Sequence, residues 1–333
     1  MKLRLLRTLC AVLVSFAAVW APPANAEITV YNAQHESLTK AWIAAFTKET
    51  GIKVNLRQGS DLELGNTILQ EGRASPADVF LTENSPAMAM VDGAGLLAPI
   101  DAATLALVPD NYRAANGKWV GIAARSTVFV YNKSKLPAAN LPKSMLDLAD
   151  AAWKGRWAGS PSGADFQAIV GALLELKGEA ATVAWLKGMK TNAAIYRGNG
   201  AVLRAVNAGE IEGGVIYHYY YFQDQARTGE ASNNTALHFF KNQDPGAFVS
   251  VSGGGVLASS KSPAEAQAFV KWVVGTGGQD ILKNGDAMEY AVGNGAESHA
   301  KLPALSGLDA PKLDPAKLNS KKVTELMTQA GLL

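Results

Sequence analysis

Strand and helix patterns alternate over the first part of the chain, and this alternation restricts it to the α/β class. The predicted elements are a strand at 28–31, a helix at 37–51, a strand at 52–59, a helix at 61–72 and a strand at 77–83. In the first helix, Leu38, Trp42 and Phe46 recur at helical spacing, and Gly51 ends the pattern. Such an order indicates a parallel sheet with helices on both faces.

The same kind of pattern continues to the C-terminus. The predicted elements are a strand at 126–132, a helix at 143–155, a strand, a Ser/Gly loop and a helix within 156–178, a helix at 200–211, a strand at 212–217, two short strands around a glycine-rich turn within 246–260, and helices at 264–282 and 321–333. We expect two α/β lobes joined by strands that cross near 125 and 249. The first lobe would comprise 27–125 and 250–300, and the second 126–249 and 301–333.

Residues 1–26 have the three parts of a secretory signal peptide. The basic start MKLRLLR precedes an apolar run of about 14 residues, and PPANA ends in a small-x-small cleavage pattern. The apolar run is shorter than the roughly 20 residues that span a bilayer. We expect cleavage after Ala26 and export to the periplasm.

Charge and cysteine content exclude several classes of function. Without Lys2, Arg4 and Arg7 of the leader, 28 basic side chains face 29 acidic ones, a net charge near −1. Nucleic-acid binding calls for a basic footprint, which this balance lacks. The single cysteine, Cys10, lies in the leader. Thiolate zinc sites, iron–sulfur clusters and cysteine nucleophiles are therefore excluded for the processed chain.

Two residues with metal-binding side chains follow strands of the first lobe. His35 comes after the strand at 28–31, and Glu83 ends the strand at 77–83. Ligands of parallel sheets bind beyond the carboxyl ends of the strands, so both side chains should lie on one rim. Singly, a histidine or glutamate at such a position is more often an ordinary loop residue.

A tyrosine cluster follows the strand at 212–217. The segment YHYYYF holds four of the chain's nine tyrosines. Adjacent residues of a strand face opposite sides, so Tyr219 and Tyr220 can share one ligand only if the strand ends before them. The helix-like FQDQARTG that follows is compatible with such a break. Taken alone, the cluster would more often serve packing or sugar stacking.

Several segments occur in the order typical of one protein family. They are ITVYNAQHE, AFTKETGIKV, EGRASPADVFLTEN, LKGEAATVAWLKGMK, NGAVLRAVNAGEI, HYYYF, DPGAF and EYAVGNGA. Over nearly all of the processed chain, the sequence resembles the periplasmic ferric-ion-binding proteins, substrate-binding components of ABC importers. The resemblance implies the two-lobed periplasmic-binding-protein fold, with ligand in the interlobe cleft and hinge strands between the lobes.

The resemblance also implies which residues hold the metal. In the family a histidine after the first strand, a glutamate after the third and two adjacent tyrosines bind Fe³⁺. The matching residues are His35, Glu83, Tyr219 and Tyr220. Tyr217 is a further candidate, as a third phenolate ligand.

A small anion completes the metal site in many family members. The matching positions are Ser162, Gly163 and Ala164 at a helix start, with Asn199. Tyr217 stands where phosphate-using members have a second asparagine, and a phenol fills the space of a tetrahedral anion. We therefore expect that phosphate is not required, and that carbonate near Arg125, or no anion, completes the shell.

The chemistry of the implied ligands agrees with a trivalent ion. Fe³⁺ is a hard acid that prefers phenolate and carboxylate oxygens. Two phenolates and one carboxylate supply three negative charges, and neutral imidazole adds a fourth donor. Because phenol has a pKa near 10, binding must displace protons.

These inferences predict a monomeric binding protein that delivers ferric iron to an inner-membrane ABC permease and its ATPase. The alternative is a same-fold binding protein for an organic cargo such as thiamine, a polyamine or a phosphate ester. An enzyme is not expected, because Ser162 lacks a G-x-S-x-G elbow and the processed chain has no histidine pair at helical spacing.

Overall fold

The computed structural model describes residues 26–333, and the predicted leader lies outside them except for Ala26. The strands are β1 (Glu27–Asn32), β2 (Lys53–Gln58), β3 (Val79–Leu81), β4 (Trp119–Asn132), β5 (Trp157–Gly159), β6 (Ala193–Ile195), β7 (Gly213–Tyr217), β8 (Thr235–His238) and β9 (Val249–Val256). The helices are α1 (Glu36–Thr50), α2 (Asp61–Glu71), α3 (Ser85–Gly93), α4 (Ala102–Leu105), α5 (Ala164–Asn192), α6 (Asn199–Ala208), α7 (His218–Arg227), α8 (Pro263–Val274), α9 (Thr276–Asn284) and α10 (Ser320–Gln329).

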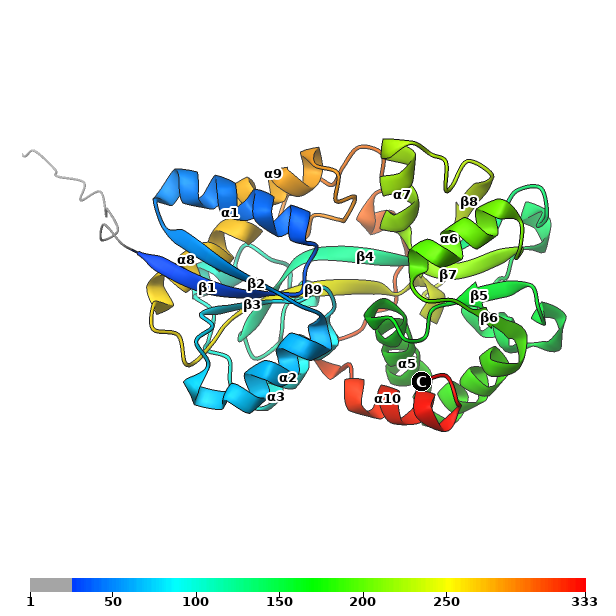
Figure 1. Cartoon of the computed structure of the whole chain (residues 1–333), viewed down its shortest axis with the longest axis horizontal. Coiled ribbons are helices and arrows are strands. Elements are labelled where there is room, and N and C mark those ends of the chain that lie inside the picture. Colours follow the sequence, from blue (N-terminus) through cyan, green and yellow to red (C-terminus); the bar gives the residue numbers. More distant parts are fainter. Residues whose placement is uncertain (1–25) are drawn as a thin grey trace, which may run out of the picture.

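The strands form a mixed sheet that runs through two helix-covered halves (Figure 1). The strand order is β2-β1-β3-β9-β4-β7-β5-β6, with β8 beside β4. In the first half β1 pairs in parallel with β2 and β3, and in the second half β5 pairs in parallel with β6 and β7. The α/β class expected from the alternation is confirmed.

Two long strands connect the halves. Strand β4 pairs with β9 at its start and with β7 and β8 at its end, always antiparallel. Its neighbouring residues Ala123 and Ala124 belong to different hydrophobic cores, one around Trp42 and Phe46, the other around Trp157 and Trp185. The backbone therefore crosses between two separately packed halves at β4 and β9.

Three local predictions were wrong. Residues 143–155 form two short 3₁₀ turns, Met145–Ala149 and Ala151–Trp153, instead of a helix. The Asn192 side chain donates hydrogen bonds to the carbonyls of Ala149 and Asp150, at 2.8 and 2.9 Å. The Asp150 carbonyl also accepts from the Trp153 backbone N–H at 2.9 Å, so Asn192, the last residue of α5, fixes the junction between the two turns.

The glycine-rich segment expected to turn is part of the continuous strand β9. A Cβ atom at Gly253 would lie 3.0 Å from Met88 Cγ, and one at Gly254 would lie 2.8 Å from Ile122 Cγ2. The glycines thus permit close packing of α3 and β4 against this strand. The helix expected at 264–282 is likewise two helices, α8 and α9, which are separated at Gly275.

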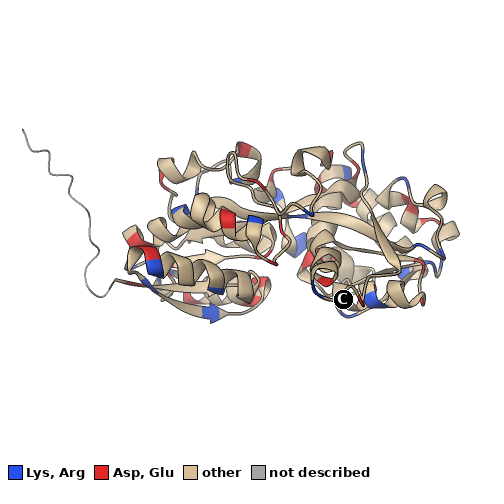
Figure 2. Ribbon diagram, turned by 90° about the horizontal axis from the view of Figure 1, so that it is seen from above, with Lys and Arg blue, Asp and Glu red and all other residues tan. Residues whose placement is uncertain are grey.

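Lys and Arg positions are interspersed with Asp and Glu positions along the ribbon of both halves (Figure 2). Within residues 26–333, no helix combines the length and apolar character needed to cross a bilayer.

Candidate metal site

The first half contributes an imidazole and a carboxylate to one rim of the sheet. His35 follows β1 and Glu83 follows β3, and these strands are parallel neighbours in which Asn32 lies beside Leu81. Their carboxyl ends therefore meet. His35 Nε2 lies 3.2 Å from Glu83 Oε1, and the two side chains are 24% and 22% exposed.

The second half contributes two phenols from the start of a helix. Strand β7 ends at Tyr217 and α7 begins at His218, so Tyr219 and Tyr220 occupy its first turn. Their rings stack with centroids 4.2 Å apart instead of facing opposite sides. The Tyr219 hydroxyl donates a hydrogen bond to Glu83 Oε1 at 3.2 Å. This contact joins the two halves across the cleft.

Asp165, in the first turn of α5, was missed by the sequence analysis. Its Oδ2 accepts hydrogen bonds from the hydroxyls of Tyr219 (3.2 Å) and Tyr220 (3.3 Å) and from Asn199 Nδ2 (2.9 Å). Its Oδ1 accepts one from Asn84 Nδ2 at 3.0 Å. Only 5% of Asp165 is exposed. An acid in the first turn of a helix that starts at the ligand rim is the sequence signal that could have identified it.

Burial and the neighbouring carboxylates keep the two phenols protonated, and neighbouring carboxylates keep the imidazole protonated. Burial raises the pKa of Tyr219 and of Tyr220, and the carboxylates of Asp165 and Glu83 raise both further. Burial and the charge of Glu83 raise the pKa of Asp165 to about 6. Burial lowers the pKa of His35, but Glu289 and Glu83 outweigh it and raise that pKa to about 10. In contrast, Arg125 and His35 overcome burial and lower the pKa of Glu83.

A fully buried ion pair lies behind the imidazole. Arg125 Nη2 lies 2.9 Å from Glu289 Oε2 and donates a hydrogen bond to Gln34 Oε1 at 2.7 Å, and neither charged side chain is exposed. Arg125 also lies 3.9 Å from Glu83 Oε1. All of these contacts are made by Nη2, whereas the buried Nε and Nη1 of Arg125 have no hydrogen-bond partner within residues 26–333. Glu289, whose loop position carries no periodic signal, was another residue that sequence reasoning missed.

The residues predicted to bind an anion, and Tyr217 as a possible third phenolate ligand, do not all reach the cluster around Asp165. Gly163 is the N-cap of α5 and Ala164 its first residue, whereas the Ser162 side chain is exposed. Asn199 contacts Asp165 directly. Tyr217 is fully buried, and its hydroxyl lies 3.3 Å from Asn84 Oδ1 and makes no hydrogen bond to Glu83 or Asp165.

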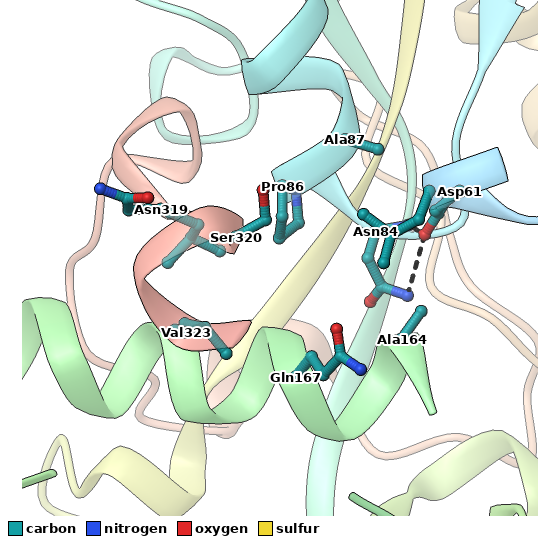
Figure 3. A pocket seen from close by; sticks show the side chains of 12 residues that line it. Asp61, Asn84, Pro86, Ala87, Ala164, Gln167, Asn319, Ser320 and Val323 are labelled. Atoms are coloured by element: carbon teal, nitrogen blue, oxygen red, sulfur yellow. Dashed lines mark hydrogen bonds between the residues drawn. The ribbon is translucent and has the colours of Figure 1, made fainter. Parts of the chain in front are cut away.

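Asp61 fixes the loop that carries Glu83. Its carboxylate accepts hydrogen bonds from the backbone N–H groups of Glu83 (2.8 Å) and Asn84 (2.9 Å). A small pocket lies beside Asp61 and Asn84, between α3, α5 and α10, and is lined further by Ala87, Gln167 and Val323 (Figure 3). None of His35, Glu83, Asp165, Tyr219 and Tyr220 lines this pocket, so the metal-binding side chains converge outside it.

The side chains that meet between the two halves combine donors suited to a hard, trivalent cation. Within residues 26–333, no three His, Asp or Glu side chains by themselves form a metal-holding group. Two phenols complete the donor set, which comprises Tyr219, Tyr220, Glu83, Asp165 and His35. Phenolate and carboxylate oxygens favour a hard ion over zinc or copper, which prefer imidazole and thiolate.

The chain is similar to a family of transport proteins and to solved structures within it. Residues 32–280 match the family described as bacterial extracellular solute-binding protein. A Serratia marcescens protein named Fe(3+)-binding periplasmic protein is 67% identical over 94% of this chain and 93% of its own. A major ferric iron-binding protein of Neisseria meningitidis is 39% identical over 96% of this chain and 97% of its own. Iron-bound HitA from Pseudomonas aeruginosa has a TM-score of 0.87 at 40% identity, covering 92% of this chain and all of that one.

Proposed function

Because this chain belongs to the bacterial extracellular solute-binding proteins, we propose that it captures ferric iron between its two lobes and delivers it to an ABC importer. Relatives named for ferric iron binding span nearly its whole length, which supports the same cargo. A periplasmic location, an inner-membrane permease with its ATPase as partner, and a monomeric state are parts of this proposal.

One observation carries the proposal: five metal-binding side chains from both halves converge at hydrogen-bond distance. His35 and Glu83 meet at 3.2 Å, and the hydroxyl of Tyr219 lies 3.2 Å from the carboxylates of both Glu83 and Asp165. The Tyr220 hydroxyl lies 3.3 Å from Asp165. A ferric ion displaces the protons that these groups now share, and each donor then binds the metal instead of its neighbour.

The charges of this donor set suit Fe³⁺. Two phenolates and two carboxylates carry four negative charges against three on the ion, with His35 as a neutral fifth donor. The guanidinium of Arg125, 3.9 Å from Glu83, offsets part of the surplus. Five protein donors leave one position of an octahedron for water.

Asp165 makes a separate anion unnecessary in this proposal. Its carboxylate lies at the N-terminal turn of α5, where backbone N–H groups and the helix dipole favour negative charge. It takes the hydrogen bonds of Asn199 and Asn84 that a small anion would otherwise take. Of the two outcomes expected from the sequence, carbonate or no anion, these contacts favour no anion.

The test is a visible titration of the purified chain with ferric citrate. We expect one equivalent of iron and an orange-red band from phenolate-to-iron charge transfer. Tyr219→Phe and Tyr220→Phe should each remove most of the band, whereas Tyr221→Phe, which alters the next residue of α7, should retain it. A protein that stays colourless would overturn the proposal and favour an organic cargo.

A further inference from the structure

We infer that Glu289 is a positioning residue for iron, which holds the Nδ1 edge of the His35 ring so that Nε2 is kept for the metal. The inference rests on the proposed function, since it concerns the same site. It assigns a role to a residue that does not touch the cargo.

The imidazole of His35 lies between two carboxylates with different surroundings. Nδ1 is 3.0 Å from Glu289 Oε1, and Nε2 is 3.2 Å from Glu83 Oε1. Glu289 is fully buried, whereas Glu83 is 22% exposed at the cleft. The ring therefore presents Nε2 to the cleft and Nδ1 to the protein interior.

Each oxygen of Glu289 has a defined partner. Oε2 lies 2.9 Å from Arg125 Nη2 and accepts a hydrogen bond from Gln34 Nε2 at 3.2 Å. Oε1 lies 3.0 Å from His35 Nδ1, and among residues 26–333 no other group is given as a partner for it. A buried carboxylate oxygen loses its hydration, so this oxygen depends on the ring nitrogen for compensation. The contact is thus strongly favoured and holds the ring in one orientation.

The same cluster also holds the backbone of His35. Gln34 Oε1 accepts from the His35 backbone N–H at 2.7 Å and from Arg125 at 2.7 Å. Gln34 Nε2 donates to Ser252 of β9 at 3.0 Å. The backbone and the ring of His35 are therefore held by one buried network of polar contacts. This network is anchored on β4 and β9 through Arg125 and Ser252.

The consequence is a fixed tautomer in the metal complex. A neutral imidazole has one protonated nitrogen and one lone pair, and the hydrogen bond of the protonated nitrogen decides which nitrogen binds the metal. With Glu289 accepting from Nδ1–H, the lone pair lies on Nε2. Loss of such a partner typically weakens metal binding about 10- to 100-fold.

The first test observes the native protein and needs no variant. Gallium(III) is a diamagnetic, hard trivalent stand-in for iron, so ¹⁵N NMR of the loaded, ¹⁵N-histidine-labelled chain reports both ring nitrogens. We expect a slowly exchanging Nδ1–H on His35 and a metal-bound Nε2. A metal-bound Nδ1, or an Nδ1–H that exchanges as fast as in an exposed histidine, would overturn the inference.

The second test compares Glu289→Ala with Glu297→Ala. Glu297 is an exposed acid eight residues along the chain, paired with Lys283, and serves as the matched control. Iron affinity, measured against a competing chelator, should fall about 10- to 100-fold in Glu289→Ala and stay unchanged in the control. In Glu289→Ala loaded with gallium, the protected Nδ1–H signal should also be lost. Circular dichroism checks that the variant is folded. If the variant does not fold, the inference is judged from the NMR spectrum of the native chain alone.

The outcomes separate the two hypotheses. If the native chain binds neither iron nor gallium, the proposed function fails and the inference fails with it. If the native chain binds both, and Glu289→Ala binds with unchanged affinity and an unchanged His35 spectrum, the inference alone is wrong.

Discussion

Two tyrosine hydroxyls and two asparagine amides donate hydrogen bonds to the single carboxylate of Asp165. The carboxylate is buried at the start of α5 and has a pKa raised by burial and by Glu83 to about 6. At neutral pH it is therefore mostly ionised. It places a negative charge at the start of this helix, where the backbone N–H groups and the helix dipole favour one.

Asp165→Ala should make iron binding depend on an added anion. In buffer free of phosphate and bicarbonate, we expect the variant to bind iron about 100-fold more weakly, because it lacks the charged carboxylate that would bind the metal. Adding phosphate or bicarbonate should recover much of the affinity, while the native chain should be unaffected by either. Equal anion dependence of the two proteins would contradict a ligand role for Asp165.

Iron affinity should fall steeply as the pH falls. In the metal-free site the pKa values of both tyrosines lie above their ordinary value, and that of His35 is about 10, so iron displaces about three protons near neutral pH. Below about pH 6, Asp165 is protonated as well and adds a fourth. The slope of log K against pH, corrected for protonation of the competing chelator, should steepen through this pH. A slope near one would argue against a site with two phenolates.

At the scale of elements, the loop between β3 and α3 depends on Asp61. Asp61→Asn replaces one accepting oxygen by a donor, so one of the backbone N–H groups of Glu83 and Asn84 loses its partner. An unsatisfied buried donor costs about 1–3 kcal/mol. We expect a lower melting temperature and weaker iron binding, because Glu83 is no longer held in place.

Asp92→Asn serves as a control for this prediction. Asp92 is also a buried acid at a helix end, but it interacts with Asn116 and Lys118 on the far side of α3. It should change stability without a comparable change in iron affinity after correction for the folded fraction. If Asp61→Asn destabilises the chain but binds iron like the native protein, the loop does not need this anchor.

Elements with a regular apolar period were predictable from the sequence. The β1-α1-β2-α2-β3 order follows from apolar side chains at strand and helix spacing, and it brought His35 and Glu83 to one rim. The break after Tyr217 was expected because two neighbouring phenols cannot share a ligand from a strand. Elements that depend on distant partners were not predictable. Asn192 binds the carbonyls between the two 3₁₀ turns, and Met88 and Ile122 crowd the Cβ positions of Gly253 and Gly254 in β9.

The site was predictable only for the residues that the family resemblance covers. Singly, a histidine after a strand and a tyrosine cluster are ordinary features, and the order of the family-like segments singled out His35, Glu83, Tyr219 and Tyr220. Asp165 resembles an ordinary acid in the first turn of a helix, and Glu289 lies in a loop without periodicity. Only the folded chain shows that Glu289 faces His35 and that Asp165 faces the two phenols.

At the scale of the whole molecule, the cleft contacts predict that iron closes the two lobes. Glu83 and Asn84 from one half meet Tyr219 and Asp165 from the other at 3.0 to 3.2 Å. Without a cation, Glu83 and Asp165 repel each other, so the metal-free chain should open about β4 and β9. Small-angle X-ray scattering should show a smaller radius of gyration on iron loading. An unchanged radius would mean that the lobes do not move relative to each other.

Export can be checked on the processed chain. Strand β1 begins at Glu27, directly after the predicted cleavage point. Mass spectrometry of the protein recovered from the periplasm should give a chain that starts at Glu27. Because Cys10 would be removed with the leader, the melting temperature should not change with reductant. A retained leader, or a chain found only in the cytoplasm, would contradict the export proposal.

The most direct test of the proposed iron site is a crystal structure of the iron-loaded chain with anomalous diffraction measured at the iron edge. We expect one strong anomalous peak between the two halves, bonded to the phenolate oxygens of Tyr219 and Tyr220, the carboxylates of Glu83 and Asp165, and Nε2 of His35. A peak elsewhere, or one bonded to neither tyrosine, would contradict it.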